Sequence, residues 1–125
     1  MPVTYRFDDE LRCVHTRCFG DATLDEIFSH FRQLSKDTTL PQPLNVLLDL
    51  TELTSFPESG QLISVAAEVR RVDEQIAFGA CAIAARDDLP FGAGRIFERL
   101  VQGTFTRSRT LRDVAAARAW LADPR

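Results

Sequence analysis

The sequence is poor in the residues that build stapled, metal-bound or histidine-based sites. Its 125 residues include only three cysteines and two histidines. An odd cysteine count without framework spacing argues against a disulfide-stapled secreted domain. No C-x-x-C, H-x-x-x-H or EF-hand spacing predicts a metal site. We therefore expect the cysteines to be buried as small apolar side chains, and we expect no metal and no cofactor.

Long apolar runs and a strong net charge are absent as well. No apolar run approaches the length of a membrane span, and residues 1–6 lack the apolar core of a signal peptide. The formal net charge of −3 does not favour nonspecific nucleic-acid binding. These absences predict a cytoplasmic protein without stable membrane insertion and without a nucleic-acid partner.

The charge that is present is unevenly distributed. Residues 1–85 carry 7 basic and 13 acidic side chains, whereas residues 86–125 carry 8 arginines and 5 acidic side chains. The simpler interpretation of the arginines in residues 86–125 is a solvated basic face. The alternative is that they form a site for an acidic partner or a phosphate. The length and the apolar content of 45% predict one globular domain, residues 1–125.

Hydrophobic periodicity predicts a chain that alternates strands and helices. A hairpin is expected first, and its second strand has two mixed faces, which suits a position near a sheet edge. Thr23 and Glu26 form a capping-box pattern at the start of the first helix. The expected strands are 3–7, 11–19, 44–50, 76–85 and 104–109. Helices are expected after Thr23, after Pro57, after a cap at Asp87 or Asp88, and over 111–121.

This order, β-β-α-β-α-β-α-(β)-α, predicts an α/β fold whose mixed sheet has a parallel centre. The nearly continuous apolar run 44–50 is typical of a central strand covered on both faces. The early hairpin leaves an incompletely covered edge, and edge strands pair with other chains. We therefore predict a homodimer.

The stretch LLDLTELTSFPESGQL, residues 47–62, contains the first candidate site. Pro57 favours a helix start, so Ser59 lies at the mouth of a helix that follows the central strand. Ligands gather at that edge of α/β sheets. Ser59 either caps the helix or receives a phosphoryl group, which would meet free helix amides. The residue types alone leave both alternatives open.

Two further patterns in the sequence are candidates for a ligand-binding or reactive site. Gly92 and Gly94 lie near a helix start, where close packing on a neighbour or a ligand approaching the amides would compensate for their helix cost. Cys13 and His15 share one strand face, but no third group is evident to orient them as a nucleophile and base. His30 is expected on the solvent side of its helix and is given no role.

Several segments together resemble the STAS superfamily of anti-sigma-factor antagonists. Its hallmark is an apolar strand ending in D-L, then D-S-S-G at a helix start, which Asp49 with Leu50 and Glu58-Ser59-Gly60 resemble here. Glu58 stands where the motif has Asp, and one serine is absent. The stretches AIAARDDLPFGAGRIFERL and TLRDVAAARAWL resemble the SpoIIAA-like, or STAS/SEC14-type, family of small bacterial proteins.

The resemblance implies a non-enzymatic regulatory module that binds a protein partner. It also implies a phosphorylation switch at Ser59, supported by Asp49, Glu58 and Gly60. A ligand or partner surface is expected at Phe91, Gly92, Gly94 and Arg95.

Two other functions are compatible with the sequence. The first is a SEC14-like carrier of a small apolar ligand or lipid, bound by a phenylalanine-rich surface. Its expected members are Phe28, Phe31, Phe91 and Phe97. The second is an enzyme with Cys13 and His15, or Ser59, as its reactive groups, which the lack of a catalytic set disfavours.

Overall fold

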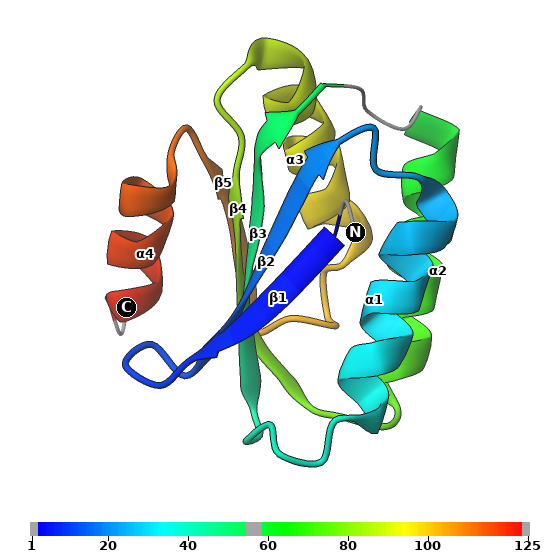
Figure 1. Cartoon of the computed structure of the whole chain (residues 1–125), viewed down its shortest axis with the longest axis vertical. Helices are drawn as coiled ribbons and strands as arrows, with labels where there is room; N and C mark the ends of the chain where they lie inside the picture. The colour runs from blue at the N-terminus through cyan, green and yellow to red at the C-terminus, as the bar shows by residue number, and fades with distance from the viewer. Residues whose placement is uncertain (1–2, 55–58, 124–125) are drawn as a thin grey trace.

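The computed structural model describes residues 3–54 and 59–123 of the chain, which form a sheet with helices on both faces (Figure 1). Five strands and four helices alternate in the predicted order. Their bounds are β1 Val3–Asp8, β2 Cys13–Gly20, α1 Leu24–Lys36, β3 Leu44–Leu53, α2 Ser59–Asp73, β4 Phe78–Ala84, α3 Asp88–Leu100, β5 Arg107–Leu111 and α4 Val114–Ala122.

The sheet order is β1-β2-β3-β4-β5, with β1 antiparallel to β2 and the remaining neighbours parallel. The predicted mixed sheet with a parallel centre is therefore confirmed, and β3 is its central strand. In Figure 1, α1, α2 and α3 cover one face, and α4 lies on the other.

Strand β1 is one edge of the sheet. Dimerisation through that edge stays a prediction, and a monomeric mass in solution at working concentration would contradict it.

Each face of the sheet has its own apolar core. The larger core, under α1, α2 and α3, contains fully buried side chains such as Phe31, Val46 and Val69. The smaller core lies under α4 and is built around the alanines of β4, which pack against Ala117 and Leu121. Small side chains on β4 let α4 approach closely, because no bulk stands between helix and sheet.

Helix α4 covers only part of its face. It packs on β3, β4 and β5 and meets β2 and β1 only at their hairpin end, where Cys13 belongs to the smaller core and Arg118 pairs with Asp8. The rest of that face of β1 and β2 lies outside the smaller core. This position explains the mixed character of β2. Its apolar residues Val14 and Cys18 face the larger core, whereas His15 and Arg17 lie on the incompletely covered face.

Local signals at the helix starts agree with the structure. Thr23 accepts a hydrogen bond from the Glu26 amide, and the Glu26 carboxylate accepts one from the Thr23 amide, so the predicted capping box is present. Asp87 occupies the cap position of α3 without a side-chain bond. The expectation that the central strand ends at Leu50 was wrong, since β3 continues to Leu53. The last strand and the last helix were also predicted three residues too early, since β5 begins at Arg107 and α4 begins at Val114 after its cap Asp113.

We expect the two glycines of α3 to respond oppositely to alanine. A Cβ at Gly94 would lie 2.8 Å from Thr110 Cγ2 and 3.2 Å from Ile83 Cγ2, whereas one at Gly92 would meet nothing within 4 Å. Gly94→Ala should therefore lower the free energy of unfolding by about 1–3 kcal/mol through overpacking. Gly92→Ala should raise it by about 0.5–1 kcal/mol through helix propensity. Urea unfolding of both variants measures this difference, and equal effects would contradict the packing argument.

Candidate functional site

Three large apolar side chains are strongly exposed among the described residues, and all three lie on α2 and α3. Ile63 is 57% exposed, Leu89 76% and Ile96 42%. Ile63 and Ile96 each fit an apolar helical period in the sequence, yet both side chains are exposed. A single exposed apolar side chain needs no explanation, but a group on neighbouring helices marks a candidate interaction surface.

Helical spacing places these side chains along the seam between α2 and α3. Arg70 on α2 donates a hydrogen bond of 2.8 Å to the Leu100 carbonyl of α3, which shows which side of α2 faces α3. Ile63 lies two turns before Arg70, and Ile96 lies one turn before Leu100. We call the exposed residues along this seam the α2/α3 surface; they are Ile63, Ala67, Arg70, Leu89 and Ile96.

Arginines border the α2/α3 surface. Arg70 and Arg99 are exposed. Arg95 is also exposed and lies 3.5 Å from Glu98 on its own helix. Exposed ion pairs of this kind are weak, so Arg95 remains available to a partner's carboxylate. The surface therefore combines an apolar centre with arginines on both helices, and the exposed Asp87 and Asp88 precede Leu89 at its other end.

Ser59 is the first residue of α2, as the proline signal predicted. Glu58 lies outside the described residues, and Gly60 follows Ser59 in the helix. Along the helical repeat, Ser59 precedes Ile63 by one turn, so the candidate switch lies at the end of the α2/α3 surface. Whether Ser59 is modified stays a prediction.

The resemblance implied that Asp49 supports a switch at Ser59, but the structure places the Asp49 side chain elsewhere. Its side chain is buried, and its Oδ1 atom accepts hydrogen bonds from the Thr51 amide at 3.0 Å and the Thr51 hydroxyl at 2.6 Å. Its Oδ2 atom lies 3.5 Å from His15 Nε2. These contacts lie on the α4 side of the sheet, whereas α2 covers the other side. Asp49 therefore supports His15 rather than the start of α2.

The four residues expected to form a ligand or partner surface, Phe91, Gly92, Gly94 and Arg95, do not share one environment. Gly94 is buried against Thr110 and Ile83, so it serves close packing. The Phe91 ring is half-buried, with the Arg112 guanidinium 3.8 Å from its centroid. Gly92 and Arg95 are exposed, as a surface role requires.

The predicted phenylalanine-rich surface does not form. Phe31 and Phe97 are buried and line an apolar cavity of about 50 Å³, open to the surface, between the sheet and α1, α2 and α3. Phe28 is half-buried near Arg32, and Phe91 lies under Arg112. Apart from Thr16 and His30, the described lining of the cavity is apolar or glycine.

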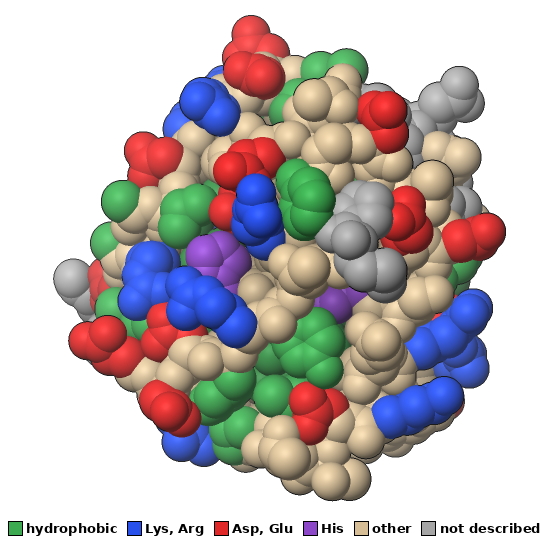
Figure 2. Space-filling view, viewed as in Figure 1, with side chains coloured by type: hydrophobic (Ala, Val, Ile, Leu, Met, Phe, Trp, Pro, Cys, Tyr) green, Lys and Arg blue, Asp and Glu red, His purple; other side chains and the backbone are tan. Residues whose placement is uncertain are grey.

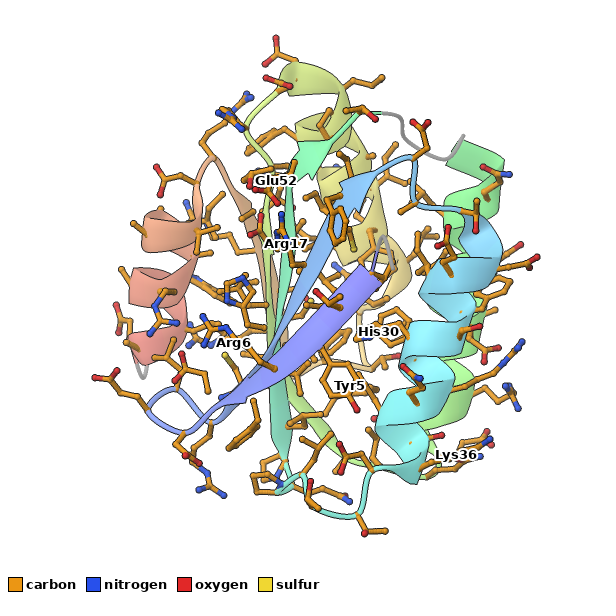
Figure 3. All side chains as sticks on the ribbon, in the orientation of Figure 1. Tyr5, Arg6, Arg17, His30, Lys36 and Glu52 are labelled. Atoms are coloured by element: carbon orange, nitrogen blue, oxygen red, sulfur yellow. The ribbon has the colours of Figure 1, made fainter. Side chains whose placement is uncertain are left out.

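His30 contradicts the expectation of a solvent-facing histidine. It is 4% exposed and points from α1 toward the sheet (Figure 3), where its Nε2 atom lies 2.9 Å from the Thr16 hydroxyl. Burial lowers the pKa of His30 to about 4. A signal was available in the sequence, because His30 follows Ile27 by three residues and precedes Leu34 by four, on the apolar stripe.

The cysteines are poor nucleophiles. Cys13, Cys18 and Cys81 are all buried and free. Burial raises the thiol pKa of Cys13 to about 11 and that of Cys18 to about 12, and it also raises the pKa of Cys81.

The sequence showed no third group that could orient His15, but in the structure Asp49 occupies that position. The two residues are far apart in the chain, and only the pairing of β2 with β3 brings them together.

The described part of the chain has neither a cluster of metal-ligating side chains nor a long apolar helix. No group of three or more histidine, cysteine or acidic side chains there is arranged to hold a metal ion. No helix in that part of the chain is both long and apolar enough to cross a membrane.

Comparison with known proteins identifies the fold. No family model matches the chain, and no curated protein sequence matches it. A crystal structure of an uncharacterized protein of the DUF3478 family from Shewanella loihica, described as having a SpoIIAA-like fold, superposes with a TM-score of 0.61. The two chains are 17% identical over 96% of this chain and 92% of that one. This chain therefore has a SpoIIAA-like fold, which confirms the sequence-based resemblance at the level of the fold.

Proposed function

We propose that the protein is a non-enzymatic regulatory module that binds a cytoplasmic protein partner through the α2/α3 surface. The observation that carries this proposal is the exposure of Ile63, Leu89 and Ile96 on two neighbouring helices. Burying such side chains supplies the apolar centre from which interfaces draw most of their affinity.

The border of the surface indicates the chemistry of the partner. Arg70, Arg95 and Arg99 are exposed on the same two helices, so a complementary surface carries acidic side chains opposite these arginines. Charges at the rim speed association and select the partner, whereas the central apolar contacts set the lifetime of the complex.

Ser59 is proposed as the switch of this interaction. A phosphoryl group there would add about −1.5 to −2 charges at pH 7, one helical turn from Ile63. An acidic partner would be repelled by this charge. Phosphorylation at Ser59 is therefore expected to release the partner while leaving α2 intact, because anions are stabilised at helix N-termini.

Site-specific crosslinking tests the docking surface. A photocrosslinking amino acid is placed at position 63 or 96, with position 115 on the exposed side of α4 as the control. The partner crosslinked in cells is identified by mass spectrometry, purified and titrated against the unmodified protein. We expect crosslinks from positions 63 and 96, and we expect Ile63→Asp to weaken the reconstituted complex about tenfold or more.

The control variant Ala115→Asp should leave that affinity unchanged. Equal crosslinking from position 115, or an affinity insensitive to Ile63→Asp and Ile96→Asp, would contradict docking at this surface. Ser59→Asp should weaken the complex, whereas Ser59→Ala should not. If the two Ser59 variants bind alike and no phosphorylated form occurs in cells, the switch fails while the docking surface stands.

A carrier of a small apolar ligand is the second candidate, and the apolar cavity under α1, α2 and α3 favours it. A cavity of roughly 150 Å³ lined by apolar side chains binds benzene. The cavity of about 50 Å³ here accommodates a smaller apolar group and is too small for a lipid chain in this conformation. Native mass spectrometry of gently purified protein tests this candidate: a retained apolar ligand would support it, and a bare protein would count against it.

A further inference from the structure

The exposed side of α3 carries an acidic group at one end and a basic group at the other. Its exposed residues recur at helical spacing and share one side of the helix; they are Asp88, Leu89, Gly92, Arg95, Ile96 and Arg99. Asp88 is the first residue of α3 and Arg99 lies in the last turn, so the rise of the helix separates them by about 16 Å. This side of α3 is therefore complementary in charge to a copy of itself turned end for end.

Both end charges can bind a group outside the chain. Among the described residues, Arg99 is exposed and its side chain forms no ion pair or hydrogen bond. Asp88 is paired with Arg112 through Oδ1 at 2.9 Å, but the Asp88 side chain is 97% exposed. A carboxylate accepts bonds at both oxygens, so Oδ2 of Asp88 can accept from a second cation without displacing Arg112.

Gly92 lies in the middle of this side of α3 and has no packing role within the described chain. A Cβ there would meet nothing within 4 Å, whereas a Cβ at Gly94 would lie 2.8 Å from Thr110 Cγ2. Glycine weakens a helix interior relative to alanine, and nothing among the described residues compensates for this cost at Gly92. A helix of another molecule can approach closely at Gly92, because no side chain stands between the two backbones.

An antiparallel second copy uses all of these features in one register. Aligning Gly92 with Ile96 of the second copy also aligns Ile96 with Gly92 of that copy, because two-fold symmetry makes the contact twice. The large side chain then fills the space that the glycine leaves. In the same register Leu89 lies opposite Arg99 of the second copy and packs along its aliphatic stem. Asp88 lies beside that arginine and pairs with its guanidinium.

Helix α2 adds apolar area to the same contact. The hydrogen bond from Arg70 to the Leu100 carbonyl shows that these two residues lie at about the same level. Both helices follow strands of the parallel part of the sheet, so they run in the same direction. Ile63 precedes Arg70 by two turns and therefore lies close to the level of Gly92, with Ala67 one turn further on. The second copy then covers Ile63 together with the exposed side of α3.

The β1 edge, where a homodimer is also predicted, does not account for this surface. Pairing of two β1 strands would leave Ile63, Leu89 and Ile96 exposed to water. The charges also differ in arrangement: the face in Figure 2, which has β1 in front, carries acidic and basic side chains intermixed rather than gathered at opposite ends. Burial of the exposed apolar side chains therefore favours the α2/α3 surface as the contact between copies.

We propose that a second copy of this chain covers the α2/α3 surface, with the two α3 helices antiparallel, when no other protein occupies it. The second copy and a different protein partner then exclude one another, and only this competition rests on the proposed function. Dimerisation is measured on the chain alone. A chain that stays monomeric but binds a partner refutes the dimer alone, whereas a dimer without a crosslinked partner refutes the proposed function alone.

Two charge-reversal variants test the antiparallel arrangement. In a dimer of Asp88→Arg two cations meet at each end, and in a dimer of Arg99→Asp two carboxylates meet at each end. In a mixed dimer of the two variants, both ends again join opposite charges. We expect each variant alone to dimerise about tenfold or more weakly than the unmodified chain, and an equimolar mixture to recover the unmodified affinity to within about threefold. Sedimentation equilibrium measures the affinities, and native mass spectrometry with one variant isotope-labelled identifies the mixed dimer.

Gly92→Leu tests the packing of Ile96. The leucine side chain would occupy the space assigned to Ile96 of the second copy, so dimerisation should weaken about tenfold or more while circular dichroism shows a folded chain. The matched control is Arg109→Asp, which makes the same charge change at an exposed residue of β5. Thr110 contacts α3, so its neighbour Arg109 lies on the other face of the sheet, and this control should dimerise like the unmodified chain.

Three results would overturn the proposal. The first is an unmodified chain that remains monomeric at concentrations up to about 1 mM. The second is a dimer that none of the three α3 variants weakens, because such a dimer forms through another surface, such as the β1 edge. The third is a mixture of Asp88→Arg and Arg99→Asp that is no more dimeric than either variant alone, although circular dichroism shows both to be folded.

Discussion

Gly79→Ala is expected to lower the free energy of unfolding by about 3–5 kcal/mol, a large loss for one added methyl group. Strand β4 is buried along its whole length. A Cβ on Gly79 would overlap the side-chain oxygen of Asn45 on the neighbouring strand. Because both residues are held by strands in a packed core, neither can move aside without breaking other contacts.

The loss is large because Asn45 connects three segments. Its side-chain oxygen accepts a hydrogen bond from the Ala80 amide at 2.9 Å, and its side-chain nitrogen donates to the Leu11 carbonyl at 3.2 Å. The pairing of β3 with β4 shifts register between Leu44 and Val46, so the Asn45 side chain serves the Ala80 amide at this irregularity. Displacing Asn45 leaves buried polar groups unpaired, at about 1–3 kcal/mol each.

A double-mutant cycle isolates this cause. Urea unfolding of Gly79→Ala, Asn45→Ala and the double variant gives the coupling energy between the two positions. If the overlap with Asn45 is responsible, the double variant is less destabilised than the two single losses predict together. Additive losses would show that Gly79 is required for another reason, such as the local backbone geometry of β4.

We expect His30 to make the protein less stable as the pH falls from about 6.5 to about 4. The folded-state pKa of His30 is about 4, lowered by burial, whereas the ordinary value is 6.5. Between these two values the unfolded chain takes up a proton and the folded chain does not. The contribution is complete above pH 6.5 and is lost toward pH 4, with a total of about 3 kcal/mol at 1.36 kcal/mol per pKa unit.

The measurement is the free energy of unfolding at pH 7 and at pH 4.5 for the unmodified protein and for His30→Gln. Glutamine can keep the bond to the Thr16 hydroxyl but does not titrate. Asp25 and Glu26, which lie in the cleft beside His30, are present in both proteins, so their titration cancels in the comparison. An equal loss of stability in both proteins on acidification would show that His30 already takes up a proton in the folded state.

The sequence by itself determined the features that depend on residues near one another in the chain. The order of strands and helices followed from hydrophobic periods, because side chains three to four apart share a helix face and alternate residues share a strand face. The capping box of Thr23 and Glu26 and the start of α2 at Ser59 depend on contacts or conformations within a few residues. The apolar period of the first helix also includes His30 on its buried face. The polarity of the histidine side chain led instead to the prediction of a solvent-facing position.

Only the tertiary structure decided which distant residues meet. The parallel pairing of β2 with β3 places Arg17 opposite Asp49 and brings His15 to the same carboxylate, across more than thirty residues of chain. The packing of α2 beside α3 left Ile63 and Ile96 exposed, although each fits an apolar period within its own helix. Periodicity identifies a helix face, but the neighbours that bury part of that face are set by the register and packing of the whole sheet.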